Sequence, residues 1–320
     1  YHHAGLAPIV KEFVEFLFIN RHIDILFATE TLSLGINMPA KSIIIDSSFK
    51  YDGLKTRLIS KSEFLQLTGR AGRRGIDSKG YAYINYDKRV ENSWYNDLFD
   101  LKPNNLKSSY SNSYGSVLNL NNKYGEKKGI EMIKKSFYSY QNKLNDKALE
   151  TNYKAKLKVL NEMNYFTDLK KNKLLTETHR DNLILGIEML NENNDIEFCL
   201  MFLASGISTS KYEISVHDKY NDLLTKYLIS QEKVNKLEAF SGVKNKINLD
   251  ITWFSIFLEF YNSDNIEYTL SKFNVTLGDF IKACREASEI SQKVYSIYEI
   301  ENFDKIAKKL KHNIIQKTMI

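Results

Sequence analysis

Short apolar runs separated by turn-forming residues characterise the first hundred residues of the chain. Two of these runs, Asp24–Ala28 and Ser42–Asp46, contain Ile-Leu-Phe-Ala and Ile-Ile-Ile and predict short buried strands. Tyr81–Tyr86 predicts another strand. Pro8–Ile19 has an amphipathic pattern that starts with proline, which predicts a helix. Because helices lie between short apolar strands, residues 1–100 are predicted to form an α/β domain with a parallel sheet.

Helical patterns with few breakers characterise the rest of the chain. All three prolines precede residue 104, and beyond it Lys, Asn, Leu, Ile and Tyr dominate, so we expect a mostly helical remainder. The clearest helices are predicted at Leu157–Phe166, Glu177–Leu190, Ile251–Tyr261 and Leu277–Tyr298.

The helix predicted at Leu277–Tyr298 has a regular apolar stripe. Thr276 and Asp279 have the spacing that caps a helix start. Lys282 and Arg285 lie three residues apart on the face away from the stripe. Two cations there indicate either an ordinary solvated face or contacts to the phosphates or bases of a nucleic acid. The stripe consists of Phe280, Cys284, Ala287, Ile290, Val294 and Ile297.

Composition limits the class of protein without selecting one. With 320 residues, of which 43% are hydrophobic, the chain is long enough for about two domains with buried cores. The net charge of +6 weakly favours an acidic partner such as nucleic acid. Cys199 and Cys284 lie far apart and form no metal-ligand pattern, which predicts a reduced, cytoplasmic setting. No apolar run approaches the ~18 residues that span a bilayer, so no membrane contact is expected.

The most distinctive local feature is the segment Gly69–Gly75, which is rich in arginine and glycine. It holds three of the eight arginines of the chain, so its composition is not accidental. It follows a predicted helix that starts at the capping-box pattern Ser60–Glu63 and runs to about Thr68. Arg70 and Arg73, three residues apart, would then point the same way and could clamp a transferring phosphoryl group. A solvated basic turn or a nucleic-acid patch is the alternative.

Two further clusters precede that segment. Residues 28–40 (Ala-Thr-Glu-Thr-Leu-Ser-Leu-Gly-Ile-Asn-Met-Pro-Ala) follow a predicted strand with hydroxyl groups and a glycine turn. This pattern suits phosphate binding and an ordinary helix-capping loop equally well. Residues 1–6 (Tyr-His-His-Ala-Gly-Leu) contain paired histidines, which more often shape a loop than bind a metal. Since no third ligand is evident near them, no metal site is predicted.

The three clusters, in this order and spacing, resemble the later motifs of superfamily-2 helicases. The narrower similarity is to the Superkiller-type (Ski-like) DExH-box RNA helicases, which include the exosome-associated helicases. It rests on His-His-Ala-Gly-Leu at 2–6, the segment 28–41, Lys-Tyr-Asp-Gly at 50–53, and Gly-Arg-Ala-Gly-Arg-Arg-Gly-Ile-Asp at 69–77. Residues 106–120 and 136–141 resemble the entry to that family's winged-helix domain, and 274–285 resemble its helical bundle, whereas 190–250 match only loosely.

The resemblance implies a fold and an order of domains. Residues 1–100 would be the second of two RecA-like domains, an incomplete α/β domain with a parallel sheet. Residues 101–190 would form a winged-helix-like domain, and residues 191–320 a helical bundle with a "ratchet" helix that contacts nucleic acid. Both of these later domains are expected to be all-α.

The resemblance also implies a site for ATP and Mg²⁺, bound mainly by a first RecA-like domain of the same protein. Arg73 would be the arginine finger at the γ-phosphate, Arg70 would support it, and Gln66 would face the nucleotide. Gly35 and Asn37 match positions near the γ-phosphate and the ribose.

Nucleic-acid contacts are implied at both ends of the chain. Thr29 matches a position that contacts the nucleic-acid backbone, and Thr31 and His3 are expected to assist. Lys282 and Arg285 match the basic positions of the ratchet helix. The expected partner is single-stranded RNA, with DNA as the alternative, and the sequence does not identify protein partners.

Two departures from the family pattern limit what the chain is expected to do. It has neither a Gly-x-x-x-x-Gly-Lys-Ser/Thr loop nor an Asp-Glu-x-His stretch, so we do not expect it to hydrolyse ATP alone. It is expected to carry the second half of a bipartite site in a longer protein. Residues 141–160 leave no room for the large arch insertion of the exosome-associated members.

The leading hypothesis is the C-terminal part of an ATP-dependent RNA helicase that moves 3′ to 5′ along single-stranded RNA in RNA processing or decay. A DNA repair helicase of the related Hel-type group is the alternative among enzymes. A non-catalytic nucleic-acid-binding or scaffold protein is the alternative outside them. The first domain is further expected to be prone to aggregation, because it would lack the strands before His2 and expose a sheet edge.

Overall fold

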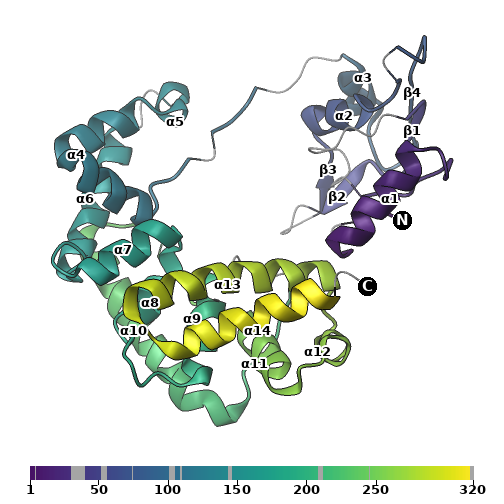
Figure 1. Cartoon of the computed structure of the whole chain (residues 1–320). Helices are drawn as coiled ribbons and strands as arrows, with labels where there is room; N and C mark the ends of the chain where they lie inside the picture. Colours follow the sequence, from purple (N-terminus) through teal and green to yellow (C-terminus); the bar gives the residue numbers. More distant parts are fainter. Residues whose placement is uncertain are drawn as a thin grey trace. The chain divides into compact units, whose positions relative to one another are not determined.

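The chain forms two compact units. The computed structural model describes residues 1–3, 5–29, 40–51, 56–73, 75–100, 105–108, 110–142, 146–207, 212–244 and 246–317. The units comprise Tyr1–Leu106 and Lys107–Ile320 (Figure 1). The domain boundaries expected at residues 100 and 190 stay predictions.

The first unit combines short strands with helices. Its helix α1 (Pro8–Ile19) begins and ends where the sequence predicted. Strands β1 (Ser42–Ile45) and β4 (Tyr81–Ile84) pair in parallel, with Ser42 opposite Tyr81. Strands β2 (Phe49–Tyr51) and β3 (Thr56–Leu58) form an antiparallel hairpin. The predicted α/β fold with a parallel sheet is therefore confirmed.

One predicted strand of this unit does not form. In the segment Asp24–Ala28, only Ala28 makes a β-bridge, which is parallel to His2. The His2 N–H donates to the Phe27 carbonyl at 2.8 Å, and the Thr29 N–H donates to the His2 carbonyl at 3.0 Å. Phe27 is 64% exposed, so the prediction of a buried strand was wrong. An apolar run becomes a buried strand only where neighbouring elements cover it, and no described element covers this one.

A small apolar core fixes the helices of the first unit to its sheet. Helices α2 (Lys61–Thr68) and α3 (Asn92–Phe99) each contribute one fully packed side chain, and the strands and their flanks contribute the others. The buried members are Ile45, Ile59, Phe64 and Leu98, with Ile43, Leu67, Ile84 and Trp94 packed against them.

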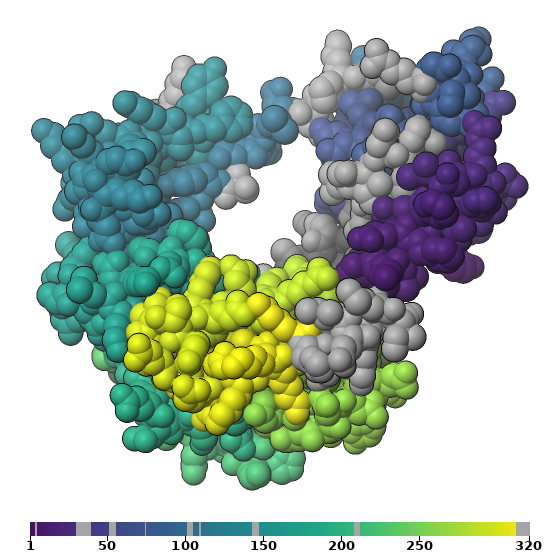
Figure 2. All heavy atoms as spheres, in the orientation of Figure 1, coloured from purple at the N-terminus to yellow at the C-terminus, as the bar shows by residue number. Residues whose placement is uncertain are grey.

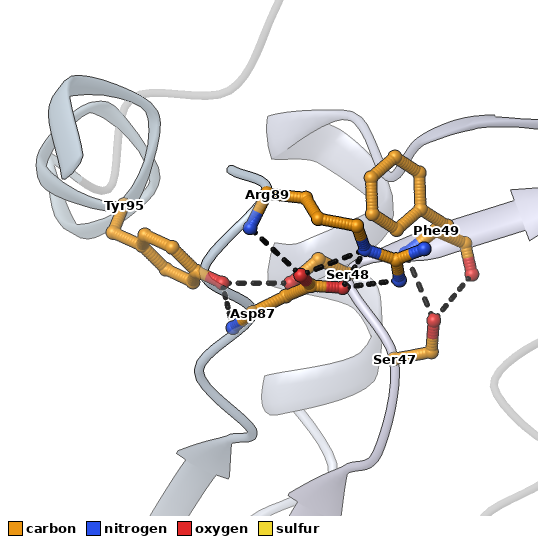
Figure 3. A network of polar contacts seen from close by, with 6 residues as sticks. All are labelled: Ser47, Ser48, Phe49, Asp87, Arg89 and Tyr95. Atoms are coloured by element: carbon orange, nitrogen blue, oxygen red, sulfur yellow. Dashed lines mark hydrogen bonds and ion pairs between the residues drawn. The ribbon is translucent and has the colours of Figure 1, made fainter. Parts of the chain in front are cut away.

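A polar network joins the start of β2 to the segment after β4 and to α3 (Figure 3). The Tyr95 hydroxyl is hydrogen-bonded to Ser48 Oγ at 3.2 Å and accepts the Asp87 N–H at 2.8 Å. Arg89 Nη2 donates to Asp87 Oδ2 at 2.5 Å, and its guanidinium lies 5.2 Å from the Phe49 ring centre. The Arg89 side chain and its backbone N–H lower the pKa of Asp87 to about 2. The ionised Asp87 therefore holds Arg89 in place over Phe49 at the start of the hairpin.

Helices joined by loops make up the described residues of the second unit, and no strand occurs among them. The predicted all-α character is confirmed, and the winged-helix assignment stays a prediction. Helix α4 bends at Gly125, whose φ of 73° lies outside the helical region. The elements are α4 (Tyr114–Lys134), α5 (Phe137–Gln141), α6 (Asp146–Glu162), α7 (Leu169–Thr178), η2 (Asp181–Leu183), α8 (Ile184–Ile187), α9 (Ile196–Gly206), η3 (Asp218–Tyr220), α10 (Asn221–Ser241), α11 (Thr252–Ser263), α12 (Ile266–Phe273), α13 (Leu277–Tyr298) and α14 (Glu301–Lys317).

Helix α13 matches its prediction over its full length. Thr276 Oγ1 accepts the Asp279 N–H at 3.3 Å, so the predicted cap is present. Every residue of the predicted apolar stripe is buried. The stripe packs along α14, where Ser291 Oγ donates to the Phe303 carbonyl at 2.7 Å. Both helices also reach the surface of the second unit in Figure 2.

The helix predicted at Glu177–Leu190 is broken instead. Helix α7 ends at Thr178, and His179 has a left-handed φ of 52° before η2 and α8 follow. The Asp181 carboxylate accepts the N–H groups of Tyr114 and Gly115 at 2.7 and 3.2 Å and so caps the start of α4. This contact joins residues far apart in sequence, so the local apolar spacing could not reveal the break.

The remaining two predicted helices lie largely within α6 and α11, although α6 begins earlier and ends at Glu162. Among the residues described, no helix is long and apolar enough to cross a bilayer.

Candidate nucleotide-binding loop and nucleic-acid helix

Helix α2, which carries Gln66, is anchored at its first turn by one carboxylate. Glu63 and Ser60 complete the predicted capping box. The Glu63 N–H donates to Ser60 Oγ at 3.3 Å, and the Ser60 N–H donates to Glu63 Oε2 at 2.7 Å. The same carboxylate accepts Arg57 Nη1 and Nη2 at 2.9 and 2.8 Å and Lys50 Nζ at 2.8 Å. Arg57, with Lys50, holds the pKa of Glu63 far below its usual range. The helix is therefore fixed to both strands of the hairpin.

The loop after α2, residues 69–77, is held by its main chain. The Ala40 N–H donates to the Arg70 carbonyl at 3.0 Å, and the Gly72 N–H donates to the Ala40 carbonyl at 2.7 Å. Gly72 has a φ of 91°, which favours glycine. A Cβ at Gly80 would lie 2.5 Å from the Ala71 carbonyl, so only glycine allows this approach. Backbone contacts thus set the position of the arginine side chains.

Arg73 is bound by Asp77, four residues further along the loop. Arg73 Nε donates to Asp77 Oδ2 and Nη2 donates to Oδ1, both at 2.7 Å. The Arg73 N–H donates to Oδ2 at 2.9 Å. The side chains are 26% exposed for Arg73 and 8% for Asp77. The hydrogen-bonded guanidinium holds the pKa of Asp77 well below its usual range, so the pair stays charged.

Helical spacing does not explain how the two predicted arginines lie. Helix α2 ends where predicted, and the positive φ of Gly72 takes the chain out of helical geometry before Arg73. Gln66 is exposed on the last turn of α2, and Arg70 is partly buried just beyond it. The Arg70 N–H donates to the Leu67 carbonyl at 3.2 Å, so one helical turn relates Arg70 to Gln66. Arg73 is placed by the loop, and the spacing argument for it was wrong.

The predicted residues of the first two motifs are only partly described. His3 and Thr29 lie on paired backbone segments, joined by the hydrogen bond from the Thr29 N–H to the neighbouring His2 carbonyl. His3 Nδ1 accepts the Gly5 N–H at 3.2 Å. Gly35, Asn37 and Thr31 lie outside the described residues.

Lys282 and Arg285 lie on the exposed side of α13, away from its buried stripe, as the sequence predicted. The Lys282 side chain is 70% exposed, and its Nζ lies 3.9 Å from Glu286 Oε1. Glu286 also accepts Arg180 Nη2 at 2.9 Å. The lysine is therefore only loosely held and can meet an anion in solvent.

The described part of the loop carries the guanidinium groups of Arg70 and Arg73, whose charge suits phosphate oxygens, but not a set of oxygens for a metal. No cluster of three or more His, Cys, Asp or Glu side chains suited to a metal occurs in the described part of the chain. The residues of the loop therefore fit the phosphates of ATP, and Mg²⁺ would need ligands from elsewhere.

Asp77 is the residue of the site that sequence reasoning missed. It lies inside the motif at 69–77 that supports the helicase resemblance. An acid four residues after an arginine is a familiar ion-pair spacing, but that rule concerns helices, and this pair spans a turn. The four-residue spacing between Arg73 and Asp77 could nevertheless have indicated this ion pair.

Comparison with known proteins agrees with this arrangement. Residues 1–75 match the family described as Helicase conserved C-terminal domain. The chain is 41% identical over 140 residues to the exosome RNA helicase MTR4 of Homo sapiens, covering 44% of the chain and 13% of the relative. It is 35% identical over 199 residues to the DExH-box ATP-dependent RNA helicase DExH10 of Arabidopsis thaliana (58% and 20%). The probable helicase HelY of Mycobacterium tuberculosis is 39% identical over 140 residues (44% and 16%).

The aligned regions cover a fifth or less of each of these relatives. The motif segments at 2–6 and 69–75 lie within the matched helicase domain. Residues 1–75 therefore match a helicase C-terminal domain, and the chain is similar, over 44–58% of its length, to parts of RNA helicases.

Proposed function

We propose that this chain supplies the second half of the ATP site of an ATP-dependent RNA helicase. A first RecA-like domain of the same protein would provide the phosphate-binding loop and most contacts to ATP and Mg²⁺. The observation that carries the proposal is the position of Arg73, on a loop fixed by backbone hydrogen bonds to Ala40 and by Asp77. Its Nη1 has no hydrogen-bond partner among the described residues and is free to meet a phosphate.

The loop residues would act on the charge that develops during hydrolysis. ATP supplies a γ-phosphoryl group whose equatorial oxygens carry that charge in the transition state. Arg73 would donate to these oxygens, Arg70 would support it, and Gln66 would face the nucleotide from the last turn of α2. Gly35 and Asn37 would lie near the γ-phosphate and the ribose.

The test is Arg73→Ala in the full-length protein that contains this chain. An arginine finger contributes about 10³-fold or more to kcat, so RNA-stimulated ATP hydrolysis should fall by about that factor. Arg89→Ala is the matched control, because Arg89 is also paired with an acid of this unit and is 77% exposed. Retained ATPase activity in Arg73→Ala would refute the assignment.

We further propose that single-stranded RNA contacts both units. His3, Thr29 and Thr31 would bind its backbone, and Lys282 and Arg285 on α13 would contact phosphates or bases. Removing one cation that binds a phosphate lowers the salt dependence of binding by about one counterion. Lys282→Ala and Arg285→Ala should therefore each weaken binding to a single-stranded RNA and flatten its salt slope. Lys308→Ala, an exposed lysine of α14 paired with Asp304, is the control that should change neither.

RNA specificity and direction of movement belong to the same proposal. The enzyme would move 3′ to 5′, act in RNA processing or decay, and work in the cytoplasm. Unwinding of RNA and DNA duplexes with 3′ or 5′ single-stranded ends tests this, since a preference for DNA would favour a repair helicase. Residues 142–145 alone separate α5 from α6, so partner contacts made by an arch are not part of the proposal.

A further inference from the structure

We propose that Asp77 is a positioning residue for Arg73. Asp77 would bind one edge of the guanidinium so that the other edge points to the γ-phosphate. The proposal rests on the proposed role of Arg73 as the finger, and it adds a second residue through which that role is exerted.

The hydrogen bonds divide the guanidinium into two edges. Asp77 takes the Nε–Nη2 edge, with both bonds at 2.7 Å. The opposite edge consists of Nη1 and the second N–H of Nη2. Each edge of a guanidinium can bind a carboxylate or a phosphate through two parallel hydrogen bonds. Arg73 can therefore keep its acid and bind a phosphate at the same time, each through two parallel hydrogen bonds, whereas a lysine ammonium has no such pair of edges.

The same carboxylate also fixes the main chain from which Arg73 extends. Asp77 Oδ2 accepts the Arg73 N–H at 2.9 Å, and the Arg73 carbonyl accepts the N–H groups of Ile76 and Asp77 at 3.0 and 2.9 Å. Both ends of the side chain are thus tied to one buried acid. A long side chain held in this way loses less freedom when it binds its phosphate.

Burial distinguishes this pair from an ordinary surface ion pair. The Asp77 side chain is 8% exposed against 23% for Asp87 in the comparable pair, and the Arg73 side chain is 26% exposed against 77% for Arg89. Water and salt screen a shielded acid less, so its hold on Arg73 persists at physiological ionic strength. The more exposed partner of the pair is the one proposed to meet ATP.

The test is a cycle of Arg73→Ala, Asp77→Asn and the double variant in the full-length protein. Asparagine has the size of aspartate and keeps an acceptor for the Arg73 N–H, but it cannot accept both guanidinium hydrogen bonds. We expect Asp77→Asn to lower kcat for RNA-stimulated ATP hydrolysis by about 10- to 100-fold, with little change in KM for ATP. In the Arg73→Ala background the same change should add almost nothing, because Asp77 acts through Arg73.

The outcomes separate the two proposals. If Arg73→Ala leaves kcat unchanged, the finger assignment fails, and the positioning role fails with it. If Arg73→Ala lowers kcat but Asp77→Asn does not, only the positioning role fails. An increase in kcat with Asp77→Asn would mean that Asp77 restrains Arg73 instead of positioning it. An undiminished loss in the Arg73→Ala background would mean that Asp77 acts on the fold.

A second variant keeps the inference testable if Asp77→Asn does not fold. Arg73→Lys leaves Asp77 in place and conserves the charge, but an ammonium lacks the second edge. We expect a kcat close to that of Arg73→Ala, with the thermal stability of the protein preserved. Full activity in Arg73→Lys would overturn the two-edge geometry.

Discussion

Different kinds of interaction stabilise the two units. The largest fully buried side chains are almost all in the second unit, where tyrosines and phenylalanines fill the space between long helices. The first unit has a core of four buried residues and depends on main-chain hydrogen bonds and ion pairs centred on Glu63, Asp77 and Asp87. The unit that carries the proposed chemistry therefore gains its geometry from polar contacts, and the helical unit gains its stability from packing.

Several apolar side chains of the first unit lie at its surface. Ile25, Phe27, Ile44 and Tyr83 of the first unit are each more than half exposed, at 75, 64, 75 and 54%. Each unit also holds one of the two tryptophans, Trp94 and Trp253. The variants Trp253→Phe and Trp94→Phe therefore allow fluorescence to follow the unfolding of each unit separately.

The largest effect is expected in the packed core of the second unit. Phe303 is fully buried and packs edge-on against Phe202, with ring centres 5.6 Å apart. Phe303→Ala leaves a cavity and should lower the free energy of unfolding of this unit by about 3–5 kcal/mol. Denaturant unfolding followed by Trp253 measures it. Phe240→Ala, at a site 90% exposed, should stay within about 0.5 kcal/mol, and equal losses in both variants would contradict the packing argument.

Backbone crowding should dominate in the first unit. Gly80→Ala forces a Cβ to within 2.5 Å of the Ala71 carbonyl, so the loop or the strand must move. We expect a loss of about 2 kcal/mol in the unfolding of this unit, followed by Trp94. Gly75→Ala has the strained φ of 77° but open space around it, and should cost only about 1 kcal/mol. If Gly80→Ala were the milder change, close approach would not be what holds the loop.

One glutamate in each unit should contribute to the pH dependence of stability with opposite sign. Glu63 has a folded pKa below its ordinary 4.5, so its stabilisation is present above pH 4.5 and is lost as pH falls below it. Glu238 is fully buried, and burial raises its folded pKa above 4.5. Its stabilisation is therefore present below pH 4.5 and is lost as pH rises through the folded value.

Glu63→Gln and Glu238→Gln separate these contributions. We expect Glu63→Gln to reduce by about 1 kcal/mol the fall in the free energy of unfolding of the first unit at acid pH. Glu238→Gln should reduce, by a similar amount, the fall in the free energy of unfolding of the second unit above pH 4.5. Unfolding between pH 3 and 8, followed by the tryptophan of each unit, gives both slopes. A variant that leaves the pH slope of its own unit unchanged would contradict the contribution assigned to that glutamate.

The smallest expected change in stability concerns the exposed apolar face of the first unit. Ile44→Thr replaces a side chain that is 75% exposed on β1, so the free energy of unfolding should change by less than about 0.5 kcal/mol. Aggregation measured by light scattering should nevertheless decrease, since exposed apolar strands associate. If aggregation stayed unchanged, the exposed apolar side chain of Ile44 would not be its cause.

Local signals predicted the elements whose ends they control. Pro8 starts α1, Ser60 and Glu63 start α2, and Thr276 caps α13, each through contacts within four residues. The helix break at His179 could not be predicted, because it depends on Asp181 binding the start of α4.

The candidate site likewise has features that the local sequence predicted and features that depend on contacts distant in sequence. The arginine-rich motif predicted which residues to inspect, and the resemblance to helicases gave them roles. The placement of Arg73 depends on Ala40 and Gly80, which approach the loop from other parts of the chain. No spacing rule within the motif contains that information.

The backbone bonds between Ala40 and the loop have a consequence for how this site can change over time. None of them involves the side chains of Gln66 or Arg70, so a substitution at these two positions need not displace the loop. During evolution these side chains could therefore change, and with them the ligand that the loop binds, while the backbone of the loop keeps its geometry. Gly72, with its φ of 91°, and Gly80, which packs against the Ala71 carbonyl, have no such freedom, so we expect little variation at these two positions.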